Sequence, residues 1–462
     1  MGDDHRFQDD ELFTEVARIA AAYRRSLPDA VVAPPVDAAT LRAGFGDLAD
    51  EPAAPLDVLA ELVAAAEPGL VKTAGPRFFG FVTGGALPSA AAADMLAPAW
   101  DQCAFNPVLS PAAAAAEDAA GTWLKELLGL PAGASVGFVT GGQAANTVGL
   151  AAGRHHVLAE AGWDVEADGL AGAPTVRVVA SEERHATIDR TLRLLGFGTR
   201  TLEPVAAGPQ GAIDVDDLQR VLAAGPAGPT IVALQAGNVN TGACDDFPAA
   251  IAAARSAGAW VHVDGAFGLW AAASPDRRHL VDGVAAADSW GCDGHKWLNV
   301  PYDSGYAVCA HPEAHRAAVS YTAAYLVGSG QGPGTLSDFA MESSRRARGF
   351  ATWAALRELG RRGVTDLVER SCAQARRFAE RLAAGGAEVA NDVVLNQVLV
   401  AFGDDDRTDR VIDGVQRDGT CWMGGTTWRG RRYMRIATSS WATTDDDVDR
   451  SVEAILRIHA SL

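Results

Sequence analysis

Short apolar segments alternate with stretches long enough for helices from about residue 110 onward. Buried strands that alternate with helices form a largely parallel sheet covered on both faces. The expected strands are residues 136–139, 175–180, 230–234, 260–263 and 306–309. This part of the chain is therefore predicted to be a large α/β domain.

The pattern changes near residue 350. Residues 350–384 have helical periodicity, with one apolar face that includes Leu367, Phe378 and Leu382, and Gly385-Gly386 ends it. Two expected strands, 394–402 and 433–437, and a closing helix follow. These elements predict a small C-terminal α+β domain packed on the large one.

The N-terminal part differs from both, because residues 9–70 alternate short helical patterns with Pro-rich breaks. We interpret it as an extension. The predicted division is residues 1–75 for this extension, 76–350 for the large domain and 351–462 for the small domain. One low-complexity loop, residues 327–334 (VGSGQGPG), is too rich in glycine to hold a fixed shape alone.

Composition narrows the class of protein. With 48% hydrophobic residues, the chain can bury a sizeable core, and its net charge of -19 argues against binding to nucleic acid or an anionic membrane surface. No apolar run reaches the length of a membrane span, and the acidic start does not read as a secretory signal. The six cysteines form no CxxC pair, so we expect a reduced, cytoplasmic protein without a metal site.

Lysine is scarce and points to one candidate nucleophile. The chain has lysine only at positions 72, 125 and 296, against 36 arginines. Lys296 follows an expected strand and is flanked by Trp297 and Leu298. Desolvation lowers the pKa of an amine, so we expect Lys296 to have a lowered pKa suited to Schiff-base formation.

A glycine pair follows the first expected strand and precedes a helical stretch at 145–155. Gly141, Gly142 and Gln143 would expose backbone N–H groups at the helix N-terminus, where phosphate or another anion binds. Such a glycine pair is more often an ordinary structural turn, because α/β proteins need turns between strands and helices. The segment is neither a P-loop nor a GxGxxG fingerprint.

Two further residues come at the carboxyl ends of expected strands, the edge at which open sheets bind ligands. Asp264 could pair with a protonated heterocyclic nitrogen, or it could only cap a helix or turn. His185 could act in the site or be purely structural. His262 is expected on the opposite face of its strand, packed in the core. Four positions at this edge thus come in the order glycine junction, His, Asp, Lys.

This ordered set, with VDGAF and CDGHKW as its most specific parts, resembles the pyridoxal-phosphate group II amino-acid decarboxylases from about residue 76 to the end. The resemblance implies the aspartate-aminotransferase fold type I, an α/β fold with a mostly parallel seven-stranded sheet and a small C-terminal α+β domain. It implies three catalytic residues: Lys296, which carries pyridoxal 5'-phosphate as a Schiff base, Asp264, which pairs with the pyridine nitrogen, and His185.

The resemblance also implies the remaining cofactor contacts. Ala266 would lie against one face of the ring and His185 would stack on the other. Gly141, Gly142, Gln143 and Asp293 would hold the phosphate, with Asn238 and His295 as further contacts. The family commonly has Asn at the position of Asp293. A carboxylate beside phosphate is unfavourable unless it is protonated or turned away.

On the substrate side, the resemblance implies that Phe81, Thr83 and Phe105 line the pocket. Residues 344–348 resemble the arginine pair that follows the family's mobile catalytic loop. Decarboxylases of the family have a tyrosine in that loop, whereas related enzymes that make aldehydes have phenylalanine. Residues 332–341 contain no tyrosine, and Leu336 or Phe339 falls nearest to the expected place.

The expected activity is decarboxylation of an aromatic or other bulky L-amino acid to an amine. An aldehyde-forming oxidative deaminase, an aminotransferase and an inactive regulatory relative are the alternatives. The resemblance also implies a homodimer with the active site at the subunit interface.

Overall fold

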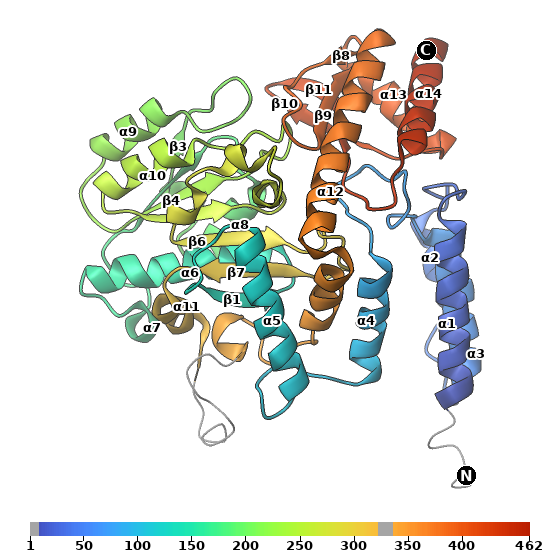
Figure 1. Cartoon of the computed structure of the whole chain (residues 1–462), viewed down its shortest axis with the longest axis horizontal. Coiled ribbons are helices and arrows are strands. Elements are labelled where there is room, and N and C mark those ends of the chain that lie inside the picture. Colours follow the sequence, from blue (N-terminus) through green and yellow to red (C-terminus); the bar gives the residue numbers. More distant parts are fainter. Residues whose placement is uncertain (1–8, 322–335) are drawn as a thin grey trace.

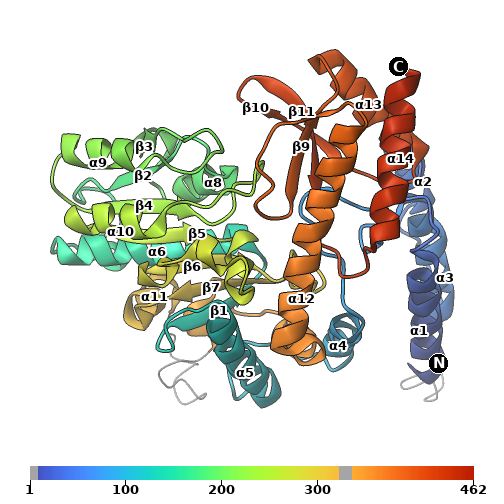
Figure 2. The same ribbon diagram turned by 45° about the horizontal axis from the view of Figure 1, so that its top comes forward.

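Two sheets organise the chain in the computed structural model, which describes residues 9–321 and 336–462 (Figures 1 and 2). The larger sheet has seven strands in the order β1-β7-β6-β5-β4-β2-β3, and β7 alone is antiparallel to its neighbours. The strands are β1 (Ser135–Val139), β2 (Arg177–Ser181), β3 (Leu202–Val205), β4 (Thr230–Gln235), β5 (Trp260–Asp264), β6 (Ser289–Asp293) and β7 (Gly305–Cys309). The prediction of a mostly parallel seven-stranded sheet is confirmed.

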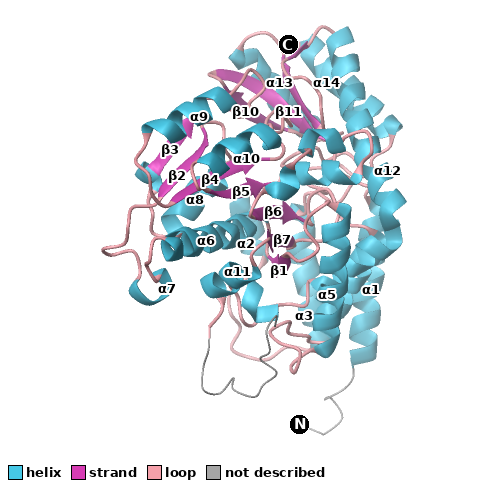
Figure 3. Ribbon diagram, turned by 60° about the vertical axis from the view of Figure 1, so that its left-hand side comes forward, coloured by secondary structure: helices cyan, strands magenta, loops and turns pink. Residues whose placement is uncertain are grey.

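Helices cover both faces of this sheet (Figure 3). On one face lie α6 (Gly142–Glu160), α8 (Ala186–Leu194) and α11 (Pro312–Val319), and on the other α9 (Val215–Ala224) and α10 (Phe247–Ser256). The alternation of side chains along β5 explains the two layers. Val261 and Val263 share a core with Ile251 of α10. Trp260 and His262 lie so close to α6 that a Cβ on its glycines would meet them within 3 Å.

The smaller sheet is antiparallel in the order β10-β11-β9-β8. Its strands are β8 (Glu388–Val389), β9 (Gln397–Ala401), β10 (Gly424–Trp428) and β11 (Arg431–Ala437), and it packs with α12 (Gly349–Ala384), α13 (Asp405–Asp418) and α14 (Asp445–Ser461). This arrangement confirms the small α+β unit. The helix expected at 350–384 is present but kinked, because Gly360 has φ 59° and ψ -176°.

The N-terminal helices α1 (Asp9–Ser26), α2 (Ala38–Gly44) and α3 (Pro55–Ala66) lie together at the edge of the molecule, next to the C-terminal unit (Figures 1 and 2). The segment after α1 attaches them, since Val32 N–H donates to the Gly419 carbonyl at 2.9 Å. The next helices, α4 (Pro88–Ala99) and α5 (Pro111–Leu127), pack on α12, and the short α7 (Val165–Asp168) follows α6. Among the helices of residues 9–321 and 336–462, none has both the length and the apolar character of a membrane span.

Candidate active site

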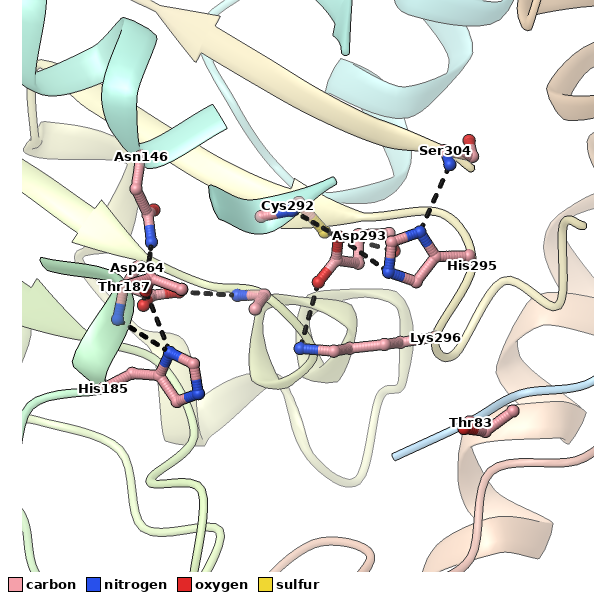
Figure 4. Close-up of polar contacts among 12 residues, drawn as sticks. Thr83, Asn146, His185, Thr187, Asp264, Cys292, Asp293, His295, Lys296 and Ser304 are labelled. Atoms are coloured by element: carbon pink, nitrogen blue, oxygen red, sulfur yellow. Dashed lines mark hydrogen bonds and ion pairs between the residues drawn. The ribbon is translucent and has the colours of Figure 1, made fainter. Parts of the chain in front are cut away.

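Four segments that are distant in sequence meet at the carboxyl ends of the parallel strands (Figure 4). Asp264 ends β5, Asp293 ends β6, and Lys296 follows three residues later. His185 precedes α8 on the connection from β2, and α6 begins directly after β1. The strand order places β5 next to β6, so the aspartate and the lysine become neighbours at one edge.

Lys296 is a largely buried amine, with 20% of its side chain exposed, and its Nζ lies 3.0 Å from Oδ2 of Asp293 (Figure 4). Burial acts to lower the pKa of the amine, but the attraction and hydrogen bond of Asp293 outweigh it, so the pKa of Lys296 is raised above its usual value. The expectation of a lowered pKa is therefore wrong. The sequence showed the apolar neighbours that desolvate Lys296. It did not show the ion pair between Lys296 and Asp293, which forms because the turn after β6 brings the lysine back over the aspartate.

Asp264 is buried and accepts two N–H donors. Its Oδ1 accepts from Ala266 N–H at 3.2 Å, and its Oδ2 accepts from Nδ2 of Asn146 at 3.0 Å (Figure 4). Asn146 is on α6, so the helix after the glycine junction also fixes the carboxylate. Sequence reasoning missed Asn146.

His185 is the N-cap of α8, and its Nδ1 accepts the Thr187 N–H at 3.3 Å and lies 2.9 Å from Thr187 Oγ1 (Figure 4). Burial lowers the pKa of His185, although the charge of Asp264 acts in the opposite direction. A neutral ring whose Nδ1 accepts hydrogen bonds has its proton on Nε2. His185 is therefore both a helix cap and a neutral ring with one free N–H donor.

The glycine junction brings α6 against Asp293. Gly142 N–H donates to Oδ1 of Asp293 at 2.5 Å. A Cβ on Gly141 would lie 2.7 Å from the His295 ring, and one on Gly142 would lie 3.0 Å from Asp293 and 3.4 Å from the methyl group of Ala266. Glycine is required here because the two segments approach so closely.

Three predicted cofactor contacts have other partners in this structure. The amide of Gln143 donates to Thr191 Oγ1 at 2.8 Å, which turns the side chain toward α8. Asn238 accepts the Asn240 N–H at 2.9 Å in a turn after β4. His295 accepts the Ser304 N–H through Nδ1 at 3.2 Å, and its Nε2 lies 3.3 Å from Asp293. Their roles toward the cofactor stay predictions.

On the predicted substrate side, the segment that contains Phe81 and Thr83 lies against the lysine. A Cβ on Gly84 would overlap the backbone oxygen of Lys296, at 1.7 Å. The Phe81 ring stacks on Trp422 with centroids 5.4 Å apart and remains 65% exposed. Phe105 instead lies beside residues 336–339, where its carbonyl accepts the Ser337 N–H at 3.1 Å.

Tyr302 is a further residue of this region that sequence reasoning missed. Its ring lies on the His295 imidazole with centroids 4.4 Å apart, and its hydroxyl is 3.4 Å from Thr83 Oγ1. It also contributes to the raised pKa of Lys296. A phenol is thus present near the lysine, on the turn after it, although residues 332–341 contain none.

The glycine-rich loop at 327–334 lies outside the described residues. The following segment is anchored by its arginines. Arg345 and Glu117 form a buried bidentate pair at 2.7 Å, and Arg348 pairs with Asp303 at 2.7 Å. Phe339, in the short helix Leu336–Phe339, packs against His315.

Residues 45–403 match the family model described as the pyridoxal-dependent decarboxylase conserved domain. The chain belongs to this family. It is 29% identical to tryptophan decarboxylase 1 of Oryza sativa subsp. japonica over 87% of this chain and 84% of that protein. It is 25% identical to 4-hydroxyphenylacetaldehyde synthase of Rhodiola rosea over 83% and 80% of the two chains. The crystal structure of Oryza sativa TDC with PLP and tryptamine superposes with a TM-score of 0.90 at 25% identity, covering 100% of this chain and 99% of that one.

The site of this decarboxylase fits pyridoxal phosphate at three of its four parts. Lys296 would supply an amine for the aldehyde, Asp264 a carboxylate for the ring nitrogen, and His185 a neutral ring to stack on the cofactor. The helix N-terminus at Gly142 suits the phosphate, but Asp293 already accepts its N–H group. The phosphate end is therefore where this chain departs from its family's pattern.

Asp293→Asn tests that departure. The amide oxygen can still accept the Gly142 N–H, but the negative charge beside Lys296 disappears while the burial remains, so the pKa of the amine should fall. We expect the cofactor-free variant to bind added pyridoxal phosphate faster at neutral pH, and its rate-against-pH curve to shift to lower pH. Stopped-flow absorbance measures both. Asp303→Asn, which removes a charge that pairs with Arg348 instead, is the control; an unshifted curve for Asp293→Asn would contradict the assignment.

Proposed function

We propose that this decarboxylase converts an aromatic L-amino acid into the corresponding amine and CO2. One observation carries the substrate class: a cluster of aromatic rings lies on the segment that meets the Lys296 backbone at Gly84. Phe81 and Phe78 both stack on Trp422, with centroids 5.4 and 4.9 Å apart, on the segment that packs against Lys296. Aromatic rings gain from offset stacking beyond the area they bury. The tryptophan and aromatic-L-amino-acid decarboxylases among its relatives support the same class.

Each residue has a role that its geometry permits. Bound pyridoxal phosphate supplies the ring that accepts the electron pair left when the bond from Cα to the carboxylate breaks. Asp264 would hold the proton on the ring nitrogen, and Lys296 would hold the cofactor aldehyde until the substrate amino group displaces it. The aromatic cluster of Phe78, Phe81 and Trp422 would orient the substrate so that its carboxylate stands perpendicular to the cofactor ring. Tyr302 Oη would then deliver a proton to Cα, which completes the amine.

The substrate class is tested by incubating the purified holoenzyme with the twenty L-amino acids and analysing products by mass spectrometry. Tryptophan, tyrosine or phenylalanine should yield the amine with one CO2. Turnover confined to acidic or small amino acids would overturn the proposal. Dependence on 2-oxoglutarate would indicate aminotransfer instead.

A second outcome, decarboxylation with oxidative deamination to an aldehyde, is favoured by the lack of tyrosine in residues 332–341. Tyr302→Phe separates the two. If Tyr302 protonates Cα, the variant should form amine about 10²–10⁴-fold more slowly, and aldehyde, ammonia and O2 consumption should rise in proportion. Tyr321→Phe is the matched control, because that hydroxyl contacts Ser343. Aldehyde as the main product of the unaltered enzyme, with O2 consumed, would favour the second outcome.

We further propose a homodimer with the active site at the subunit boundary. Phe13, Val58 and Leu62 expose about half of each side chain on α1 and α3, beside a groove of about 560 Å³ between these helices. Phe81 is exposed on the segment that meets the Lys296 backbone at Gly84, which suits a site completed by a second copy. Light scattering should give twice the chain mass of 48.0 kDa. A monomer with full activity would contradict this arrangement.

A cytoplasmic location is proposed from cysteine usage, since all six cysteines are free in the structure. Cell fractionation with an antibody to the chain tests it, and recovery outside the soluble cytoplasmic fraction would contradict it.

A further inference from the structure

A line of buried polar side chains runs beneath the site, between the sheet and α6. It consists of Trp260 and His262 on β5, Ser289 on β6 and Asn146 on α6, all at most 2% exposed. Burial of so many polar groups is costly unless each has a hydrogen-bond partner. His262 was expected to face away from Asp264. That expectation is wrong, because residues two apart on a strand share a face.

The line is continuous. Trp260 Nε1–H donates to Ser289 Oγ at 3.0 Å, and Ser289 Oγ lies 2.9 Å from His262 Nδ1. His262 Nε2 lies 3.0 Å from Asn146 Oδ1. Asn146 Nδ2 then donates to Asp264 Oδ2 at 3.0 Å (Figure 4). A connection of four hydrogen bonds thus joins the core of the sheet to the carboxylate at its edge.

The chemistry of the groups fixes where the protons are. Asn146 Nδ2 faces a carboxylate and the Thr187 hydroxyl, at 3.0 and 3.1 Å, so it is the donor end of the amide and Oδ1 faces His262. His262 must therefore have its proton on Nε2. Burial lowers the pKa of His262 to about 4, so the ring is neutral and its Nδ1 accepts from Ser289. Every donor in the line points toward Asp264.

Asn146 also forms a hydrogen bond toward the His185 side of the site. Its second Nδ2 hydrogen reaches Thr187 Oγ1, which lies 2.9 Å from His185 Nδ1. Since the Thr187 oxygen accepts from Asn146, its own hydrogen is free to point at His185. Both hydrogens of the Asn146 amide are thus used, one for Asp264 and one for the Thr187 hydroxyl, which in turn bonds to His185.

Three glycines leave room for this line. A Cβ on Gly149 would lie 2.6 Å from His262, one on Gly153 would lie 2.8 Å from Trp260, and one on Gly291 would lie 2.5 Å from Asn146 Oδ1. Gly149 and Gly153 are one turn apart on the face of α6 that bears Asn146. Glycine at these three positions therefore lets α6 and the sheet approach closely enough for the buried polar side chains to form their hydrogen bonds.

We propose that Asn146 is a positioning residue that orients Asp264 and His185 together, and that His262 sets the direction of its amide. The proposal rests on the predicted roles of Asp264 and His185 toward the cofactor. Without His262, the Asn146 amide could rotate and present its oxygen to the carboxylate. The ring nitrogen of the cofactor would then meet a displaced partner, and the stacking histidine would lose a support at the same time.

The test compares Asn146→Leu, His262→Leu and His262→Gln with the unaltered holoenzyme. The first two should bind pyridoxal phosphate about tenfold or more weakly, the size expected when a buried group loses its hydrogen-bond partner. They should also change the visible circular dichroism of the bound cofactor and lower the protonated fraction of its ring nitrogen, read by ¹⁵N NMR. His262→Gln retains a side-chain donor and should be closer to the unaltered protein.

His315→Leu is the matched control, because His315 is equally buried, has its pKa lowered to about 4, and bonds to Ser135 and Phe339 instead. It should leave cofactor affinity and spectra unchanged. Asp264→Asn distinguishes two ways in which the proposal could fail. If only this variant lowers the protonated fraction of the ring nitrogen, the proposal for Asn146 and His262 is wrong. If it leaves that fraction unchanged, the placement of Asp264 against the ring nitrogen is wrong.

A measurement on the unaltered protein keeps the proposal testable should a variant not fold. Side-chain ¹⁵N NMR should find His262 neutral at pH 7 with its proton on Nε2. A proton on Nδ1, or a doubly protonated ring, would overturn the arrangement directly.

Discussion

Lys296→Ala should lower turnover by about 10²–10⁴-fold or more, since the amine is the group that is predicted to hold the cofactor. Borohydride should fix pyridoxal phosphate to the unaltered chain and leave none on the variant. Because lysine occurs at only three positions, peptide mass spectrometry of the reduced protein can assign the modified residue without ambiguity. We expect the label on the peptide that contains Lys296.

Lys72→Arg is the control for this result. Lys72 lies over the Tyr23 ring near the N-terminal helices, with its Nζ 4.8 Å from the ring centroid. Its replacement should leave both labelling and turnover intact. Label on Lys72 or Lys125, or turnover retained by Lys296→Ala, would refute the central assignment.

Asp264→Asn should produce the second largest loss, about 10²–10³-fold in turnover, the range found when one preorganised electrostatic group is removed. The amide is similar in shape and can still accept the Ala266 N–H, although it loses the hydrogen bond from Asn146. It cannot balance a positive charge on the ring nitrogen. The ¹⁵N resonance of ring-labelled cofactor should therefore move toward that of the unprotonated pyridine.

The measurement that checks this loss is kcat with the best substrate from the product screen, together with the thermal midpoint. Asp245→Asn is the matched control, since Asp245 is equally buried but accepts the Ile213 and Gln235 N–H groups away from the lysine. Burial raises the pKa of Asp245 to about 6. A fall in kcat for Asp264→Asn with no change at the ring nitrogen would contradict the charge-pairing role.

The prediction from sequence was most accurate for strands with many apolar residues. All five predicted strands of the large sheet are present, because continuous apolar runs report burial on both faces. The strand β3 was missed because Leu202-Glu203-Pro204-Val205 is an edge strand that includes proline and a charge. The sequence prediction gave no bounds for β6, because Ser289, Gly291 and Asp293 leave it with few strand-forming residues. It is a strand because β5 and β7 pair with it on both sides.

The sequence by itself determined the fold class and the family and singled out the lysine that is predicted to bind the cofactor, since apolar periodicity, scarcity of lysine and ordered motifs are all local properties. Only the tertiary structure decided how these groups are arranged. Asn146 and Asp264 are 118 residues apart, yet share a hydrogen bond. The raised pKa of Lys296, the line through His262 and the position of Tyr302 likewise depend on which segments pack together. Hydrogen-bond partners and local charge follow from packing across the chain, which no local pattern specifies.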